Sequence, residues 1–247
     1  MKQRPDFSRR STELEIMDDL NCAGEVVDQT LRELEIINRW LGGNRLTMHA
    51  VTKILKQAKM LKQAKNKTGA PIFIADLGCG SGDILKRIAD LGRRHGLPMK
   101  LTGIDANPHI IAVARKNCAT YPEITFEEID VLGNDFRQRK FDIIIGTLFF
   151  HHFSDNTLVA LFTRIKEQAT LGIIINDIHR HWLAYHSIRL LTQLFSRSDM
   201  VKFDAPLSVL RAFNRYELEV LLSQSGIRTY QIQWKWAFRW EIRIRTT

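Results

Sequence analysis

Five short apolar runs occupy the middle of the chain, and each is followed by helix-like sequence. The runs are IFIADL, LTGID, ITFEEID, FDIIIG and GIIIND, all between residues 72 and 177. Such alternation is typical of a parallel sheet that is covered by helices. The C-terminal segments TYQIQWKWAF and RWEIRIR instead alternate apolar and polar residues around a short turn, as an antiparallel pair does. The sequence therefore predicts an α/β fold with a mixed sheet and a reversed strand at its end.

The N-terminal region is expected to be helical. Apolar residues at helical spacing indicate amphipathic helices over residues 25–41 and about 47–64, and Gly42-Gly43 is a stop between them. The densest basic run, at residues 53–67, is interpreted as the solvated face of the second helix. We therefore expect residues 1–68 to form a helical extension or cap, ahead of a sheet domain over residues 69–247.

A long insert precedes the C-terminal strand pair. Roughly fifty residues separate GIIIND from this pair, which is more than an ordinary crossover helix needs. The pattern predicts a helix, a polar turn with Pro206 and a second helical stretch. We expect this insert, at about 180–213, to lie at the ligand-binding edge of the sheet as a lid.

Composition excludes several classes of protein. The 247 residues are 45% hydrophobic and 26% charged, which fits a globular protein and not a disordered one. The three cysteines form no C-x-x-C pair, so neither a disulfide framework nor a cysteine zinc site is indicated. No apolar run is long enough for a membrane span or a secretory signal, and we expect a cytoplasmic protein. The net charge of +9 alone would fit an anionic partner, but the basic residues are spread along the chain.

A glycine-rich loop follows the first apolar run, in the sequence D-L-G-C-G-S-G-D. In a strand–loop–helix unit, such a loop lets a ligand approach the backbone closely at the start of the helix. A phosphate-binding P-loop is excluded because G-x-x-x-x-G-K-[ST] is absent. A dinucleotide fingerprint is excluded because its third glycine, counted from Gly78, would fall on Asp83.

The loop resembles the first motif of class I S-adenosylmethionine-dependent methyltransferases. Asp105 ends the next strand, where this family places an acid that binds both ribose hydroxyls, and Asp130 stands at the family position that meets the adenine amino group. The resemblance covers about residues 70–245 and implies a Rossmann-like, seven-stranded mixed sheet with its last strand antiparallel. S-adenosylmethionine carries no phosphate, so a glycine backbone with acids suits it, and Asp76 can hold its ammonium group. The cofactor-binding residues are expected to be Asp76, Gly78, Cys79, Gly80, Gly82, Asp105, Ala106, Asp130, Val131 and Thr147.

The segments after the fourth and fifth strands supply candidate bases. The [DNS]-P-P-[FY] tetrad of many amine methyltransferases is replaced by Gly-Thr-Leu-Phe at residues 146–149, which argues against such amine acceptors. His151 and His152 follow in an aromatic rim, and His179 and His181 follow the next strand. Imidazole suits base catalysis near neutral pH, so these four histidines are the candidate catalytic residues, each with a purely structural role as the alternative.

A metal site made of Asp177, His179, His181 and His186 is a weaker alternative, because transfer from a sulfonium needs no metal. Arg189 and Arg211 either pair with an acidic acceptor or form salt bridges of their own. The N-terminal helices either cap the acceptor pocket or contact a second copy in a homodimer.

We therefore expect a methyltransferase for a small, partly apolar acceptor. The resemblance is to small-molecule enzymes of bacterial secondary and quinone metabolism, and it implies O-methylation of a phenolic or polyketide-like hydroxyl. A lid over the cofactor argues against large polymers and hence against nucleic acid. An RNA or protein methyltransferase and a catalytically silent scaffold subunit that binds the cofactor stay open as alternatives.

Overall fold

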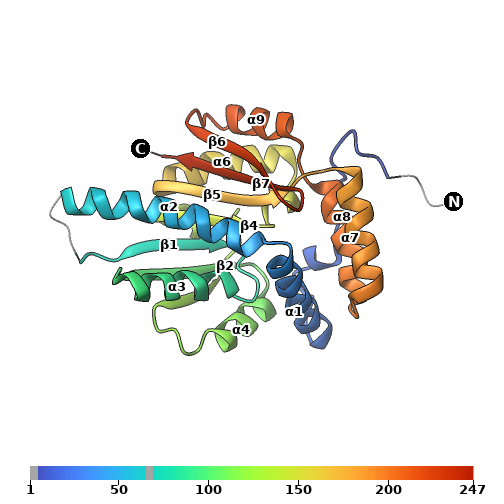
Figure 1. Ribbon diagram of the computed structural model, residues 1–247, viewed down its shortest axis with the longest axis horizontal. Coiled ribbons are helices and arrows are strands. Elements are labelled where there is room, and N and C mark those ends of the chain that lie inside the picture. The colour runs from blue at the N-terminus through green and yellow to red at the C-terminus, as the bar shows by residue number, and fades with distance from the viewer. Residues whose placement is uncertain (1–4, 65–68, 247) are drawn as a thin grey trace.

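The computed structural model describes residues 5–64 and 69–246, without the side chains of residues 57–64, and is built around a seven-stranded sheet (Figure 1). The strand order is β3-β2-β1-β4-β5-β7-β6, and β7 is antiparallel to both of its neighbours while β1 to β5 are parallel. This confirms the predicted Rossmann-like fold with its reversed last strand. The strands are β1 Ile72–Leu77, β2 Met99–Asp105, β3 Ile124–Glu128, β4 Phe141–Thr147, β5 Ala169–Ile178, β6 Tyr230–Lys235 and β7 Arg239–Arg245.

Helices cover both faces of the sheet, because its central strands are buried on both sides. One apolar core lies beneath α6 and α9, and the other lies beneath α2, α3 and α4. Ala50, Val51 and Leu55 place α2 in the second core, so this N-terminal helix forms part of the sheet's own covering layer. The helices of these layers are α2 Gly43–Ala64, α3 Asp83–His95, α4 Pro108–Asn117, α6 Asp155–Gln168 and α9 Arg215–Gln224, and the short α5 Asn134–Arg137 follows β3.

The remaining helices gather at the carboxyl edge of the parallel strands, at the right of Figure 1. Here α1 packs against α8, which also contacts α7 and the two short 3₁₀ helices η1 and η2. These elements therefore surround the edge at which ligands bind in open α/β sheets. Their bounds are η1 Ile16–Asp18, α1 Glu25–Trp40, η2 Phe150–His152, α7 Trp182–Phe195 and α8 Asp199–Arg211.

Two local expectations are wrong in detail. The second helix begins at Gly43 and not near residue 47, so only a tight turn at Leu41 and Gly42 separates it from α1. Pro206 lies inside α8 and not in a turn. The turn of the insert falls at residues 196–198 instead.

The position of that turn has a clear cause in the tertiary structure. The carboxylate of Glu33, on α1, accepts hydrogen bonds from the backbone N–H groups of Arg197 and Ser198, and the Ser198 hydroxyl accepts one from Val201 N. These contacts fix the start of α8. Pro206 removes one helical hydrogen bond of α8, but its side chain is buried.

The basic run at 53–67 falls largely on residues whose side chains lie outside the described part of the chain. Among the described helices, none is both long and apolar enough to span a bilayer.

Candidate active site

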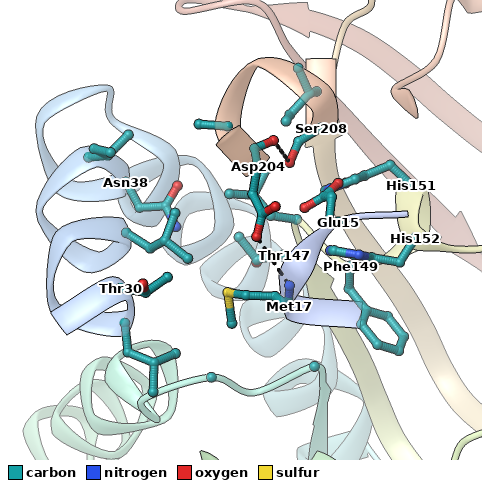
Figure 2. A pocket seen from close by; sticks show the side chains of 18 of the residues that line it. Glu15, Met17, Thr30, Asn38, Thr147, Phe149, His151, His152, Asp204 and Ser208 are labelled. Carbon is teal, nitrogen blue, oxygen red and sulfur yellow. Dashed lines mark hydrogen bonds and ion pairs between the residues drawn. The ribbon is translucent and has the colours of Figure 1, made fainter. Parts of the chain in front are cut away.

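A cavity of about 710 Å³ opens at the carboxyl edge of β1, β2 and β4. Its walls come from the glycine loop, from α1, α7 and α8, from the β6–β7 turn and from the segment around η1. The lining is mostly apolar with a few polar groups, as is usual for small-molecule sites. Figure 2 shows Glu15, His151 and His152 on one side of this cavity, facing α8, with Thr30 and Asn38 of α1 across from them.

The glycine loop forms one wall because of its backbone conformation. Gly78, Gly80 and Gly82 all have positive φ values, of 65°, 50° and 79°. A Cβ atom on Gly78 would lie 2.2 Å from Cδ2 of Phe149, so only glycine fits against this ring. Gly78, Cys79 and Gly80 line the cavity, whereas Gly82 is the N-cap of α3 and packs toward Cys118 and Phe126.

Asp76 is a buried acid in the wall of the cavity. Its side chain lines the cavity, and its Oδ1 atom has no hydrogen-bond partner among the described residues. Burial, with the neighbouring charges of Asp83 and Asp105, raises the pKa of Asp76 well above its ordinary value. A buried carboxyl that is unpaired among other acids is stabilised by a bound cation. The residues of this wall therefore fit a ligand that carries an ammonium and a sulfonium group and no phosphate.

The other expected cofactor residues also face this cavity. Asp105 accepts a hydrogen bond of 3.0 Å from Asn107 N, and burial raises its pKa. Asp130 accepts one of 2.9 Å from Leu132 N, which fixes its turn. Ala106, Val131 and Thr147 line the same cavity. The Thr147 hydroxyl is hydrogen-bonded at 3.0 Å to Thr47, on α2.

His151 is the buried histidine of the site. Its Nδ1 atom is 2.7 Å from Oδ1 of Asp177, and its side chain is 2% exposed. Asp177 also accepts hydrogen bonds from the backbone N–H groups of Phe150, His151 and Ile178. Burial opposes ionisation of Asp177, but the charge and hydrogen bond of His151 and these N–H groups outweigh it, so the pKa of Asp177 lies below its ordinary value. An ionised Asp177 keeps the proton of His151 on Nδ1 and leaves Nε2 as the acceptor in the cavity wall.

His152 is held by a second carboxylate, which comes from the N-terminal segment. Its Nδ1 atom is 2.6 Å from Oδ1 of Asp18, and Asp18 is also paired with Arg211. Burial opposes the ionisation of Asp18, but hydrogen bonds from His152 and Arg211 hold the pKa of Asp18 below its ordinary value. Arg211 also donates to the His152 carbonyl. Of the two roles left open for Arg211, the structure therefore shows the salt bridge.

His179 and His181 do not line the cavity and are not brought together with His151. His179 accepts a hydrogen bond of 3.2 Å from Trp234 Nε1 and packs against Trp240. Burial and the nearby charges of His181 and Arg180 lower the pKa of His179 to about 4. His181 caps α7 by accepting from Leu183 N. Asp177 pairs with His151 instead of joining these two histidines in a metal site.

Glu15 and Asp18 are not indicated by the sequence, although both line the cavity. They lie in the acidic segment E-I-M-D-D, at residues 15–19. That segment has no strand or helix period that would direct one of its acids toward the sheet. Its proximity to His151 and His152 therefore depends on the tertiary fold and not on a local pattern.

Comparison with known proteins agrees with this geometry. Residues 74–170 match the family described as "Methyltransferase domain". Among solved structures, the fold resembles the citrinin polyketide synthase CMeT domain, with a TM-score of 0.55 and 18% identity over 77% of this chain and 52% of that chain. It also resembles magnesium protoporphyrin IX methyltransferase from Synechocystis PCC 6803 with bound SAH, with a TM-score of 0.51 and 14% identity over 85% and 86% of the two chains.

Two curated relatives are much longer proteins. Clavatol synthase of Penicillium crustosum is 37% identical over 65 residues, which is 26% of this chain and 2% of the relative. Methylphloroacetophenone synthase of Cladonia uncialis is 25% identical over 149 residues, 56% of this chain and 6% of the relative. The chain thus spans only a few hundredths of the length of these relatives. The family match and the fold together show that the chain contains an S-adenosylmethionine-dependent methyltransferase domain.

Proposed function

We propose that this protein transfers a methyl group from S-adenosylmethionine to a hydroxyl group of a small, partly apolar acceptor of phenolic or polyketide-like type. The observation that carries the proposal is the buried His151–Asp177 pair, whose free Nε2 atom borders the same cavity as the acid-lined glycine loop. The citrinin polyketide synthases of Monascus ruber and Monascus purpureus, each 32% identical over 73 residues, are further relatives whose name supports this class of acceptor.

The cofactor would be held by acids and glycines of the carboxyl edge. Asp76, with its unpaired Oδ1, would meet the ammonium group, and Gly78 and Gly80 let the ligand lie against the backbone. We assign Asp105 to the ribose hydroxyls and Asp130 to the adenine amino group. Ala106 and Val131 would flank the ring, and Cys79 and Thr147 would complete this wall.

The reaction needs alignment of the acceptor, exclusion of water and a base. The cofactor supplies an electrophilic methyl group on a sulfonium. His151 accepts the proton of the acceptor hydroxyl at Nε2, because its Nδ1 proton is held by Asp177. The ionised Asp177 then stabilises the imidazolium. A base with its partner fixed in this way is expected to contribute about 10²- to 10⁴-fold to the rate.

The cover of the cavity favours a small acceptor. Ala184, Ile188 and Leu191 of α7, Val209 of α8 and Leu31 of α1 line it. These apolar walls suit the ring or chain of an acceptor and exclude water from the reacting atoms. A polymer would require the helices to move apart.

The first test is calorimetric titration with S-adenosylmethionine and, separately, with NADH. Micromolar binding of the former alone is expected, because the wall formed by the glycine loop carries Asp76 and Asp105 and its glycines lack the dinucleotide spacing. Methylation of a panel of phenols is then measured with radiolabelled cofactor, for the wild type and for His151→Asn, His179→Asn and the exposed control His95→Asn. Loss of activity in His179→Asn with full activity in His151→Asn would refute the assignment of the base. Product analysis separates oxygen from carbon methylation, and steep loss of activity with salt would favour a nucleic acid acceptor.

A further inference from the structure

The segment before α1 crosses the carboxyl edge of the sheet and is anchored at several points. Arg10 donates 2.9 Å hydrogen bonds to the carbonyl groups of His151 and Phe153. The backbone N–H groups of Ile16 and Met17 donate to the Asp204 carboxylate on α8, at 2.8 and 3.1 Å. Figure 2 shows the contact between Met17 and Asp204, with Glu15 on the same segment directed toward His151. The segment therefore holds Glu15 in a fixed place in the wall.

Glu15 and His151 face each other with unused hydrogen-bonding atoms. Oε1 of Glu15 lies 3.6 Å from Nε2 of His151, which is too far for a hydrogen bond. Neither atom has a hydrogen-bond partner among the described residues, although both side chains are more than nine-tenths buried. Buried polar atoms without partners are costly, so a pair of them in a ligand cavity indicates a polar group of the ligand.

The two atoms require different partners. Asp177 fixes the proton of His151 on Nδ1, so Nε2 can only accept a hydrogen bond while the ring is neutral. Burial raises the pKa of Glu15 to about 7, so its carboxyl is protonated over much of the range below that pH and can donate. A group that gives a hydrogen bond to His151 and takes one from Glu15 must be both donor and acceptor, as a hydroxyl is.

Neighbouring groups shift the pKa of Glu15 in both directions. The positive charges of His152 and of Arg211, whose Nη1 is 3.7 Å from Oε1, favour the ionised form. The Ser208 hydroxyl also favours it, whereas the Asp204 carboxylate disfavours it. Burial outweighs the favourable contacts, so the pKa of Glu15 rises to about 7 and its carboxyl is mostly protonated below that pH.

We propose that Glu15 is a catalytic residue of this site and that the acceptor hydroxyl is bound between its carboxyl group and Nε2 of His151. This inference deepens the proposed function and rests on it. In the step, the hydroxyl proton passes to Nε2 of His151 while its oxygen forms the new bond to the methyl carbon. The bond between that carbon and sulfur breaks, and its electron pair stays on sulfur, which leaves S-adenosylhomocysteine. Glu15 donates a hydrogen bond to the oxygen throughout, and the proton on His151 is then lost to solvent.

The arrangement also distinguishes the acceptor from its product. A methyl ether can still accept a hydrogen bond from Glu15, but it has no proton to give to His151. The product therefore leaves one buried acceptor without a partner and is bound more weakly than the acceptor.

The test is calorimetric binding of phenol and 4-ethylphenol, with their methyl ethers as controls, in the presence of S-adenosylhomocysteine at pH 6 and pH 8.5. Both phenols stay neutral over this range, so the probe itself does not titrate. The wild type is expected to bind phenols more tightly than ethers, and about tenfold more weakly at pH 8.5 than at pH 6 as Glu15 loses its proton.

Three variants separate the role of Glu15 from a structural one. Glu15→Ala is expected to lose about tenfold in phenol affinity at pH 6. Glu15→Gln keeps a donor of the same size at every pH, so it should retain the affinity and lose the part of the pH dependence that is due to Glu15. Glu13→Gln, on the exposed side of the same segment, serves as the matched control and should behave as the wild type.

Binding of S-adenosylhomocysteine separates failure of the proposed function from failure of this inference. A wild type that fails to bind S-adenosylhomocysteine refutes the proposed function itself. Intact S-adenosylhomocysteine binding overturns the inference alone if phenols do not bind, if Glu15→Ala binds them normally, or if Glu15→Gln keeps the full pH dependence. Phenol binding that requires added Zn²⁺ and is abolished by a chelator would also overturn it, and would assign Glu15, His151 and His152 to a metal site.

Discussion

Replacement of Asp177 by Asn tests the catalytic proposal and the packing of the site together. Asp177 is fully buried and accepts from three backbone N–H groups and from Nδ1 of His151. An Asn side chain has the same shape, but its NH₂ group must face a donor, and the negative charge is gone. Leaving a buried donor without its acceptor costs about 1–3 kcal/mol, and more where the acceptor is charged. Four donors share this carboxylate and Asn retains one acceptor oxygen, so we expect the free energy of unfolding to fall by about 3 kcal/mol.

The same substitution should lower kcat by at least about 100-fold. Without the carboxylate, His151 can carry its proton on Nε2, where it can no longer accept the proton of the acceptor. The affinity for S-adenosylmethionine should be unchanged, because Asp177 does not line the cavity. The assays are urea unfolding, radiometric methylation of a phenol panel, and calorimetry with the cofactor.

Asp142→Asn is the matched control. Asp142 lies near the start of β4, at the opposite edge of the sheet, and accepts from Phe73 N and from the Thr170 hydroxyl. It is partly exposed, so its replacement should cost less than about 1 kcal/mol and leave kcat unchanged. Wild-type kcat in a folded Asp177→Asn protein would refute the role of the His151–Asp177 pair.

Four further changes follow from the structure. Asp105→Ala should weaken S-adenosylmethionine binding by about 2–3 kcal/mol, from the loss of two charge-assisted hydrogen bonds, and unchanged calorimetric affinity would contradict the cofactor assignment. Gly78→Ala should abolish cofactor binding and lower the melting temperature, because its Cβ would overlap the Phe149 ring; a fully active, equally stable variant would exclude this close approach. Ala237→Gly should raise the free energy of unfolding in urea by about 1 kcal/mol, because Ala237 has a φ of 62° in the β6–β7 turn. A destabilised variant would show that this backbone conformation is not strained. Glu15→Gln should raise the melting temperature more at pH 8 than at pH 5. The pKa of Glu15 in the folded protein is raised from 4.5 to about 7, so the stability of the wild type falls as the pH rises through this window, whereas Gln has no such penalty. An equal gain in melting temperature at both pH values would contradict the raised pKa.

The sequence predicted the sheet and one wall of the site because both depend on local signals. Apolar runs of strand length mark β1 to β5, and the carboxyl ends of parallel strands meet at one edge. The resemblance to the methyltransferase family implied that Asp76, Asp105 and Asp130, near the ends of successive strands, bind one ligand, and all three line the same cavity. The spacing of the glycines is by itself enough to exclude a dinucleotide fingerprint and a phosphate-binding loop.

The second wall was decided only by the tertiary structure. Asp18 meets His152 across 134 positions of sequence, and Ile16 meets Asp204 across 188. No periodicity in E-I-M-D-D indicates which acid turns inward, because the segment is fixed by hydrogen bonds to α8 and η2 rather than by a repeating secondary structure. The same holds for Pro206, whose local preference for a turn is overridden by the packing of α8. Local patterns thus determined the strands and the acid-lined wall of the cavity, whereas the residues of its second wall depend on contacts that form only when distant segments pack together.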